Sequence, residues 1–158
     1  MCRGSANAIL GFSGSIRDLN LLQYAKNLID KRDEPNIDYE YIITKFVPNV
    51  QKLFSNNGRN TNDKGVDSID SYYLLGYKDK MWLIDFDYCV LLEKESYNSI
   101  GSGKSYALGS LKTTEKLNLT PIERIRLALQ SASKFDTGVA PPFYIINTDN
   151  DEIIEYLD

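Results

Sequence analysis

The chain has 158 residues, of which 42% are hydrophobic, and its formal net charge at pH 7 is -4. A chain of this length and composition can bury one hydrophobic core, so we expect a single domain over residues 1–158. The negative charge argues against a nucleic-acid surface, which needs a basic stripe. No apolar run reaches the roughly 18 residues of a membrane span. We therefore expect a cytoplasmic protein without nucleic-acid or membrane partners.

Histidine is absent from the sequence. Its absence removes the usual general base of serine and cysteine hydrolases and the commonest zinc ligand. Any hydrolytic mechanism must take its base from a lysine, a carboxylate or a free α-amino group, whose ordinary pKa of about 8 suits neutral pH. The two cysteines, Cys2 and Cys89, have no metal-ligand spacing and give no disulfide framework.

The first half of the chain predicts a strand followed by two helices. Residues 6–12 form a strand-like run, and Ser15 can then cap a helix in which Asp18 lies three residues further on. Residues 32–35 should end this helix. A second helical pattern begins near Asp38 and reaches Phe54, and Pro48 inside it should kink or split the helix. Residues 55–70 are rich in Asn, Asp, Gly and Ser, which is typical of an exposed loop.

The second half predicts strands, two further helices and two closing strands. The strand-like runs are residues 72–75, 81–84, 88–92, 143–146 and 153–157, with turns at 85–87 and 147–150. A short helix is expected after Gly103. The sequence Thr120, Pro121, Ile122, Glu123 predicts the start of another helix, because Thr at the N-cap and Glu at N3 form a capping box. Such segregated runs favour antiparallel sheets with helix layers.

The segment Gly101, Ser102, Gly103, Lys104, Ser105 holds the last half of a phosphate-loop pattern. The full pattern requires glycine at position 98, where the chain has asparagine, and a strand running directly into the loop. The apolar run that ends at Leu92 stops well before it. A glycine-rich turn that lets a helix pack closely is the alternative interpretation, so nucleotide binding ranks last among our hypotheses.

Three segments, taken together, carry a resemblance to a known family. They are residues 9–15 with the following helix, residues 100–103 followed by 106–108, and residues 128–138. In order and spacing they resemble the proteasome family, most of all the bacterial HslV type of peptidase subunit, an N-terminal nucleophile hydrolase. The resemblance covers nearly the whole chain.

This resemblance implies an α+β fold, a four-layer αββα sandwich with helices outside two antiparallel sheets. It implies homo-oligomeric rings, with an ATP-dependent unfoldase as an expected partner. It also implies hydrolysis of peptide bonds by an N-terminal threonine, with its own amine as base and a nearby lysine and aspartate that tune it. That chemistry fits a sequence without histidine.

By matching position, the resemblance gives three residues supporting catalytic roles. Gly11 would donate its backbone N–H to the oxyanion, although a glycine ending a strand is an equal alternative. Ser102 would lie beside the nucleophile's amine, or else be a turn serine. Asp136 would brace Ser102 and the amine, unless it is simply solvated. The carbonyls of Ser133, Asp136 and Val139 would hold Na⁺ or another monovalent cation; no other cofactor is expected.

The sequence departs from the family at its start. The family's threonine, aspartate and lysine lie on strands before residues 9–14, where this chain has only residues 1–8. Thr113 and Thr114 cannot replace the nucleophile, because an internal threonine has no free amine. Cys2, exposed after removal of Met1, is a thiol alternative. However, in the family layout it would start the strand that leads into Gly11.

We therefore expect a proteasome-like subunit that lacks its N-terminal catalytic strands and is inactive as written. The alternative from another class is a non-catalytic assembly or binding protein with the same fold. In either case unpaired strand edges and an open apolar face predict poor solubility or oligomerisation.

Overall fold

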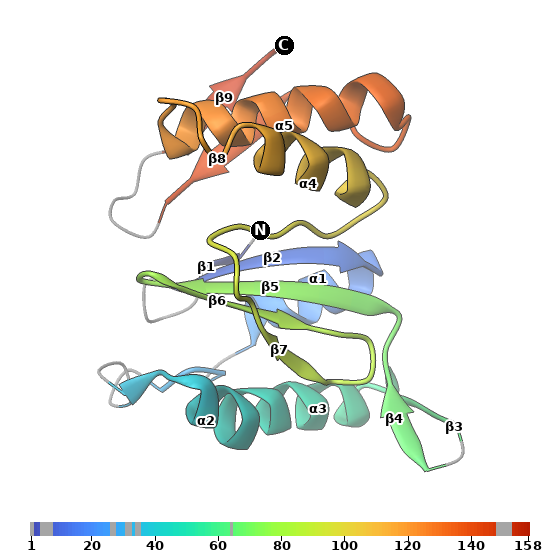
Figure 1. Ribbon diagram of the computed structural model, residues 1–158. Coiled ribbons are helices and arrows are strands. Elements are labelled where there is room, and N and C mark those ends of the chain that lie inside the picture. The colour runs from blue at the N-terminus through green and yellow to red at the C-terminus, as the bar shows by residue number, and fades with distance from the viewer. Residues whose placement is uncertain are drawn as a thin grey trace. The chain divides into compact units, whose positions relative to one another are not determined.

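The computed structural model describes residues 2–3, 8–25, 28–30, 33, 36–63, 65–147 and 153–158. The chain forms two compact units, Met1–Lys94 and Glu95–Asp158 (Figure 1). The single domain over residues 1–158 stays a prediction. The expected strand residues 6–7, most of the helix stop at 32–35 and most of the turn at 147–150 lie outside the described residues.

The first unit is built on an antiparallel sheet. Its strands follow the order β1-β2-β5-β6-β7, and each neighbouring pair is antiparallel, as the sequence predicts. The turn predicted at residues 85–87 does connect β6 to β7. The strands are β1 Cys2–Arg3, β2 Ile9–Gly14, β5 Ser71–Tyr77, β6 Lys80–Ile84 and β7 Val90–Leu92.

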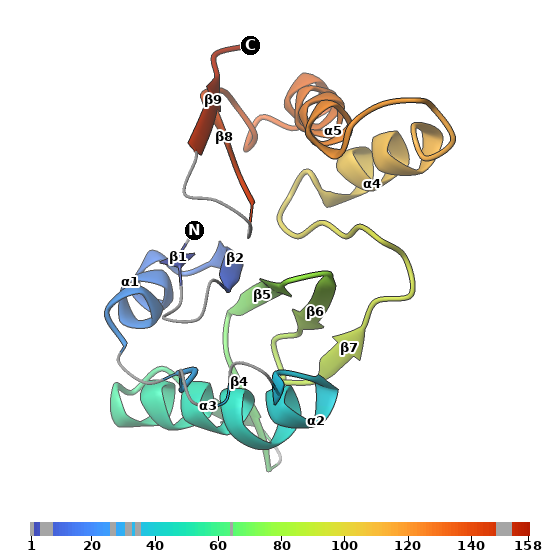
Figure 2. The ribbon, with the colours of Figure 1, turned by 90° about the vertical axis from the view of Figure 1, so that its left-hand side faces the viewer.

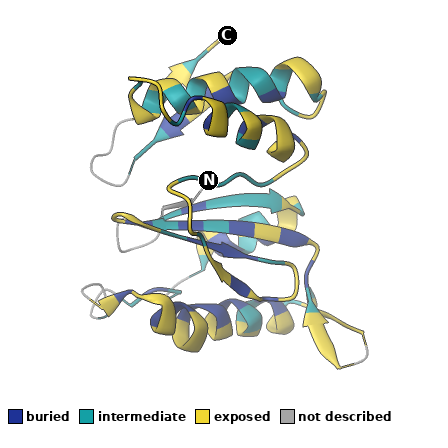
Figure 3. Ribbon diagram, in the orientation of Figure 1, coloured by how far each residue is buried: buried dark blue, intermediate teal, exposed yellow. Residues whose placement is uncertain are grey.

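Helices cover one face of this sheet. They are α1 Ile16–Tyr24, α2 Tyr39–Tyr41 and α3 Val47–Asn56, and α2 and α3 run along one side of the sheet in two views (Figures 1 and 2). Inward side chains of β5 alternate with outward ones, which gives the banded colouring in Figure 3. The buried side chains of the sheet and those of α1 and α3 form one hydrophobic cluster, which includes Leu22, Phe54, Tyr73 and Trp82.

The opposite face of the same sheet is also apolar. The strand register places five apolar side chains on it: Ile9, Leu74, Met81, Leu83 and Leu91. Gly11 lies on this face, opposite Leu74. A sheet with apolar side chains on both faces is typical of the inner layer of a sandwich rather than of a sheet with one face in water.

The second helical segment stays helical from Tyr39 to Asn56, so Pro48 does not split it, but the helix type changes just before the proline. A π-helical turn, Ile42–Phe46, precedes α3, in which Pro48 occupies the first turn. Inside an α-helix, a proline cannot donate the usual hydrogen bond and clashes with the preceding turn, but it is tolerated in a first turn. The change of helix type just before Pro48 places it in such a first turn. α1 is shorter than its apolar pattern indicates and ends at Tyr24.

The prediction of an exposed loop at residues 55–70 is wrong in part. α3 continues to Asn56, and a hairpin of β3 Thr61–Asp63 and β4 Val66–Ser68 follows. Cross-strand hydrogen bonds stabilise it: Thr61 Oγ1 lies 2.9 Å from Ser68 Oγ, and Asn62 Nδ2 donates to Asp67 Oδ1. Nearly every residue of the hairpin is exposed, so the exposed part of the prediction is confirmed.

The second unit contains two packed helices and a hairpin. α4 is Lys104–Thr113, α5 is Pro121–Phe135, and β8 Phe143–Ile146 pairs with β9 Ile153–Tyr156. The capping box predicted at Thr120 and Glu123 is present at the start of α5. The two helices pack through small and apolar side chains, namely Ala107, Leu111, Ala128 and Ala132.

Within the described ranges, no helix has the length and apolar character that a membrane crossing requires.

Candidate active site

Ser102 and Asp136 lie beside the same residue, Gly138. A Cβ atom placed on Gly138 would lie 2.9 Å from Ser102 Oγ and 3.1 Å from Asp136 Oδ1. Thus the turn before α4 and the turn after α5 bring together two of the residues that the sequence predicts for the site. The hydroxyl and the carboxyl group border one small volume of the second unit.

Asp136 is held by its own turn. It is the C-cap of α5, its N–H donates to Ala132 O at 2.8 Å, and its carbonyl accepts from Val139 N at 3.1 Å. Its Oδ1 accepts a 2.7 Å hydrogen bond from Gly138 N. Asp136 is half-buried rather than a freely solvated residue. The carboxyl group therefore has a defined position.

The Gly-Ser-Gly turn rests against the end of α5. Gly101 has a φ of 96°, which favours glycine. At Gly103 a Cβ would lie 2.8 Å from Val139 Cγ2 and 2.9 Å from Ala132 Cβ. The close packing expected of this glycine-rich turn is therefore present. This packing places Ser102 near Asp136.

Gly11 lies in the first unit, on β2. It pairs with Leu74, and a Cβ on it would meet Leu74 Cβ at 3.5 Å, an ordinary contact. Packing therefore does not require glycine there. Among the described residues, the β1–β2 register pairs Ile9 and Leu10 but not Gly11. The oxyanion role of Gly11 stays a prediction.

The proposed cation ligands lie at the C-terminal end of α5. Ser133 is in its last turn, and Asp136 and Val139 belong to the turn that follows. Carbonyls at a helix C-terminus carry partial negative charge, and a carbonyl that accepts one hydrogen bond keeps a second lone pair. This donor set fits a monovalent cation in its chemistry. Among described side chains, no group of three or more Cys, Asp or Glu could hold a metal ion.

Cys2 is not on the strand that leads into Gly11, contrary to our expectation. It lies on β1, a separate strand that pairs antiparallel with β2, and its partner in the register is Leu10. The strand that contains Cys2 is thus the neighbour of the strand that contains Gly11.

The phosphate-loop geometry is incomplete, as the sequence predicts. β7 ends at Leu92, and residues 93–103 contain no strand before α4 begins at Lys104. Asn98 Oδ1 accepts a hydrogen bond from Ser99 N, so its side chain folds onto its own backbone. A strand that runs directly into the loop is missing here.

A buried polar cluster around Asp18 was missed in the sequence. Ser15 makes no side-chain cap to α1. Instead the fully buried Asp18 accepts from Ser71 Oγ at 2.9 Å and from Arg59 Nε at 2.5 Å. The hydrogen bond to Asp18, and then the negative charge of Asp18, raise the pKa of Arg59. The sequence feature that could have indicated this cluster is the position of Asp18, a carboxyl group on the inward side of α1.

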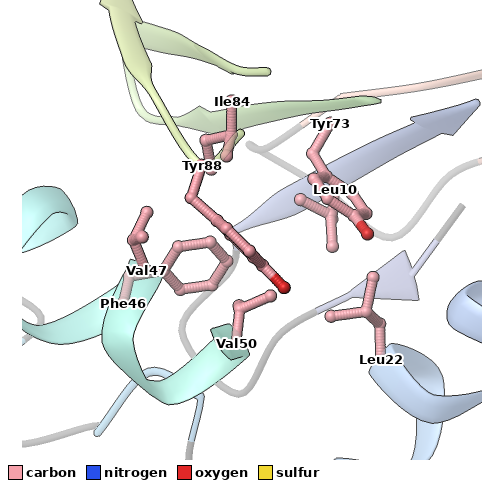
Figure 4. A pocket seen from close by; sticks show the side chains of 8 residues that line it. All are labelled: Leu10, Leu22, Phe46, Val47, Val50, Tyr73, Ile84 and Tyr88. Carbon is pink, nitrogen blue, oxygen red and sulfur yellow. The ribbon is translucent and has the colours of Figure 1, made fainter. Parts of the chain in front are cut away.

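The pocket in the first unit is part of the core. Eight side chains line it: Leu10, Leu22, Phe46, Val47, Val50, Tyr73, Ile84 and Tyr88 (Figure 4). The gaps between them are too narrow for a water molecule. Burial raises the pKa of Tyr73 and of Tyr88, so both are neutral phenols, and the Tyr88 hydroxyl donates to Asn60 Oδ1. We find no binding site in this pocket.

A shallow groove between α4 and α5 is lined without charged side chains. Its lining is mostly hydroxyls: Ser105, Tyr106, Ser110, Thr113, Thr114 and Ser131, with Gly109 and Leu127. It therefore offers no carboxyl or amino group that could act as a general acid or base.

Comparisons with known proteins show which fold these elements form. No model of a protein family matches the chain, and no curated protein matches it. BPH of Thiobacillus denitrificans matches with a TM-score of 0.67 and 18% identity over 86% of this chain and 72% of BPH. Its complex with epoxomicin gives a TM-score of 0.66, with the same identity and coverage.

Eukaryotic HslV from Trypanosoma brucei matches with a TM-score of 0.58 and 19% identity, over 86% of this chain and 74% of HslV. The chain has an HslV-like fold. This mixed α/β fold agrees with the resemblance found in the sequence. At such low identity the match shows the fold alone.

Proposed function

We propose that the chain is a subunit of a proteasome-like or HslV-like self-compartmentalising protease lineage, a cytoplasmic hydrolase of peptide bonds. The HslV-like fold supports this proposal. The observation that carries it is the convergence of Ser102 Oγ and Asp136 Oδ1 beside Gly138, at the positions that the resemblance assigns to catalytic support.

Each supporting residue has a chemical task in this proposal. Ser102 and Asp136 would accept and pass on protons beside an attacking group whose base is an α-amino group, as a sequence without histidine requires. The Gly11 N–H would stabilise the oxyanion, and such a donor is worth about 3 kcal/mol in the transition state. The carbonyls of Ser133, Asp136 and Val139 would hold a monovalent cation that steadies the turn after α5.

The attacking group is the part of the mechanism that these three residues do not supply. Cys2 is a candidate, because it lies on the strand next to that of Gly11. Intact mass and N-terminal sequencing of the native protein would identify the group that stands at its N-terminus.

The complete fold in this proposal is a four-layer αββα sandwich. The first unit supports it, because its sheet carries apolar side chains on the face away from α1–α3, among them Leu74 and Leu83. Rings of identical subunits and an ATP-dependent unfoldase partner belong to the same proposal. Exposed apolar side chains on α1 support contact with other subunits, since Ile16 is 74% and Tyr24 is 80% exposed.

Epoxomicin gives a direct test, since a solved structure of BPH contains it. The chain as written lacks the family's threonine, so we expect peptide hydrolysis, and its loss with epoxomicin, from a native protein whose N-terminus carries an attacking group. Ser102→Ala should lower the activity at least 10-fold, because a group that moves protons in the transition state is lost. Ser105→Ala, in the first turn of α4, is the matched control and should retain it.

The epoxomicin experiment also decides between an enzyme and a non-catalytic protein with the same fold. A native protein with a confirmed N-terminus that neither cleaves peptides nor binds epoxomicin would contradict the enzyme proposal. It would favour the non-catalytic assembly or binding protein with the same fold, for which exposed Ile16 and Tyr24 would be the contact residues.

A further inference from the structure

Gly138 occupies its position for reasons of space rather than backbone conformation. Among the described glycines, Gly14, Gly58, Gly65 and Gly101 have positive φ angles, and Gly138 does not. Its backbone conformation is thus open to any residue. The volume where its side chain would lie is already bordered by Ser102 Oγ at 2.9 Å and Asp136 Oδ1 at 3.1 Å.

The N–H of Gly138 also holds one of these two side chains, that of Asp136. It donates to Asp136 Oδ1 at 2.7 Å, which fixes the carboxyl group on the side of Ser102. A larger residue at position 138 would have to move the serine hydroxyl, the carboxyl group or the whole turn by several tenths of an ångström.

We propose that Gly138 is a positioning residue, which sets the distance and direction between the Ser102 hydroxyl and the Asp136 carboxyl group. As a statement about catalysis, this rests on the proposed function. Gly138 touches no reacting atom, and it acts only through the two side chains beside it.

Gly103 supports this arrangement from the other segment. Its missing Cβ leaves room for Val139 Cγ2 and Ala132 Cβ, so the turn that carries Ser102 can approach the end of α5. Gly103 and Gly138 thus lie on opposite sides of the contact between the turn before α4 and the turn after α5. Substitution of either should separate Ser102 from Asp136.

The chain offers a matched control at Gly109. This glycine also lies at an ordinary backbone angle, within α4, and a Cβ on it would meet nothing within 4 Å. Gly109→Ala should leave the unfolding temperature unchanged or raise it slightly, because alanine favours the helix. Gly138→Ala should lower the unfolding temperature relative to Gly109→Ala, because the added methyl meets Ser102 Oγ and Asp136 Oδ1 and these atoms must shift.

A double-mutant cycle tests the contact itself without any need for activity. If the methyl of Gly138→Ala meets Ser102 Oγ, its effect on the unfolding temperature should shrink when Ser102→Ala is present. Gly109→Ala should be additive with Ser102→Ala. Equal effects of Gly138→Ala in both backgrounds would overturn the inference.

Kinetics tests the positioning role. In protein that hydrolyses peptides, Gly138→Ala should lower kcat about 10-fold or more with KM little changed, and Gly109→Ala should change neither. An unchanged kcat in Gly138→Ala would overturn the positioning role. Absence of hydrolysis in the unsubstituted protein would contradict the proposed function instead, and the unfolding cycle would still decide whether the contact exists.

Discussion

Asp18 is a fully buried acid, and its side-chain partners Arg59 and Ser71 lie far from it in sequence. It accepts hydrogen bonds from Ser71 Oγ and Arg59 Nε, and the Arg59 side chain is 27% exposed. Asp18→Ala would leave both donors without their acceptor. We expect it to lower the free energy of unfolding by about 3 kcal/mol, measured by urea denaturation followed by circular dichroism.

Asp67→Ala is the control for this prediction. Asp67 is exposed and accepts one side-chain hydrogen bond, from Asn62. Its removal should change stability by less than about 0.5 kcal/mol. Similar losses for the two variants would mean that the buried ion pair contributes no more than an exposed contact.

The sequence could suggest single residues of the site but not their surroundings. Ser102 and Asp136 came from the resemblance, and the structure places both beside Gly138. The partner of Asp18 could not be inferred, because Arg59 is 41 residues away. Arg59 reaches Asp18 because the chain turns at the end of α3. In this turn Gly58 has a φ of 64°, and Arg59 N donates a hydrogen bond to Phe54 O.

At the scale of the element, the start of α5 depends on its capping box. Thr120 Oγ1 accepts from Glu123 N at 3.2 Å, and Glu123 Oε2 accepts from Thr120 N at 2.7 Å. Thr120→Ala should cost about 1 kcal/mol of stability, whereas Thr120→Ser should cost little because the hydroxyl remains. Thermal unfolding of the two variants in parallel would check this, and equal losses would contradict it.

The same box gives a pH dependence. The hydrogen bonds from the Thr120 backbone N–H and then from its hydroxyl lower the pKa of Glu123 from its ordinary value of 4.5. Glu123 thus has a lower pKa in the folded state than in the unfolded state. Its stabilising effect is complete above the unfolded-state value of 4.5 and is lost as the pH falls through the folded-state pKa. Hence the difference in unfolding temperature between the unsubstituted protein and Glu123→Ala should shrink from pH 7 to pH 3. A difference that is constant or grows over this range would contradict the capping role.

Elements with strong local signals were predictable, and those without were not. The box at Thr120 located α5, and apolar and aromatic runs located β5 and β6. The hairpin of β3 and β4 has almost entirely exposed side chains, so no alternation marks it. Its stability comes from cross-strand hydrogen bonds, which composition does not show.

At the scale of the whole molecule, the sequence predicted antiparallel sheets with helix layers but not the two compact units. The apolar runs of β5 and β6 indicate apolar side chains on both faces of the sheet, but only the register assigns Leu74 and Leu83 to the face away from the helices. Which residues cover that face depends on contacts between distant segments, and local spacing carries no information about them.

The proposed assembly gives the last prediction. Ile16 and Tyr24 are 74% and 80% exposed and lie on one helix, so water contacts a large apolar area there. We expect the purified protein to sediment as an oligomer, and Ile16→Asp with Tyr24→Asp to shift it toward monomer. Leu117→Asp, at a residue that is 55% exposed after α4, is the control and should leave the oligomer intact. A monomer that unfolds cooperatively at high temperature would contradict both the ring and the assembly-protein alternative, because a stable single subunit would need no neighbour to cover these side chains.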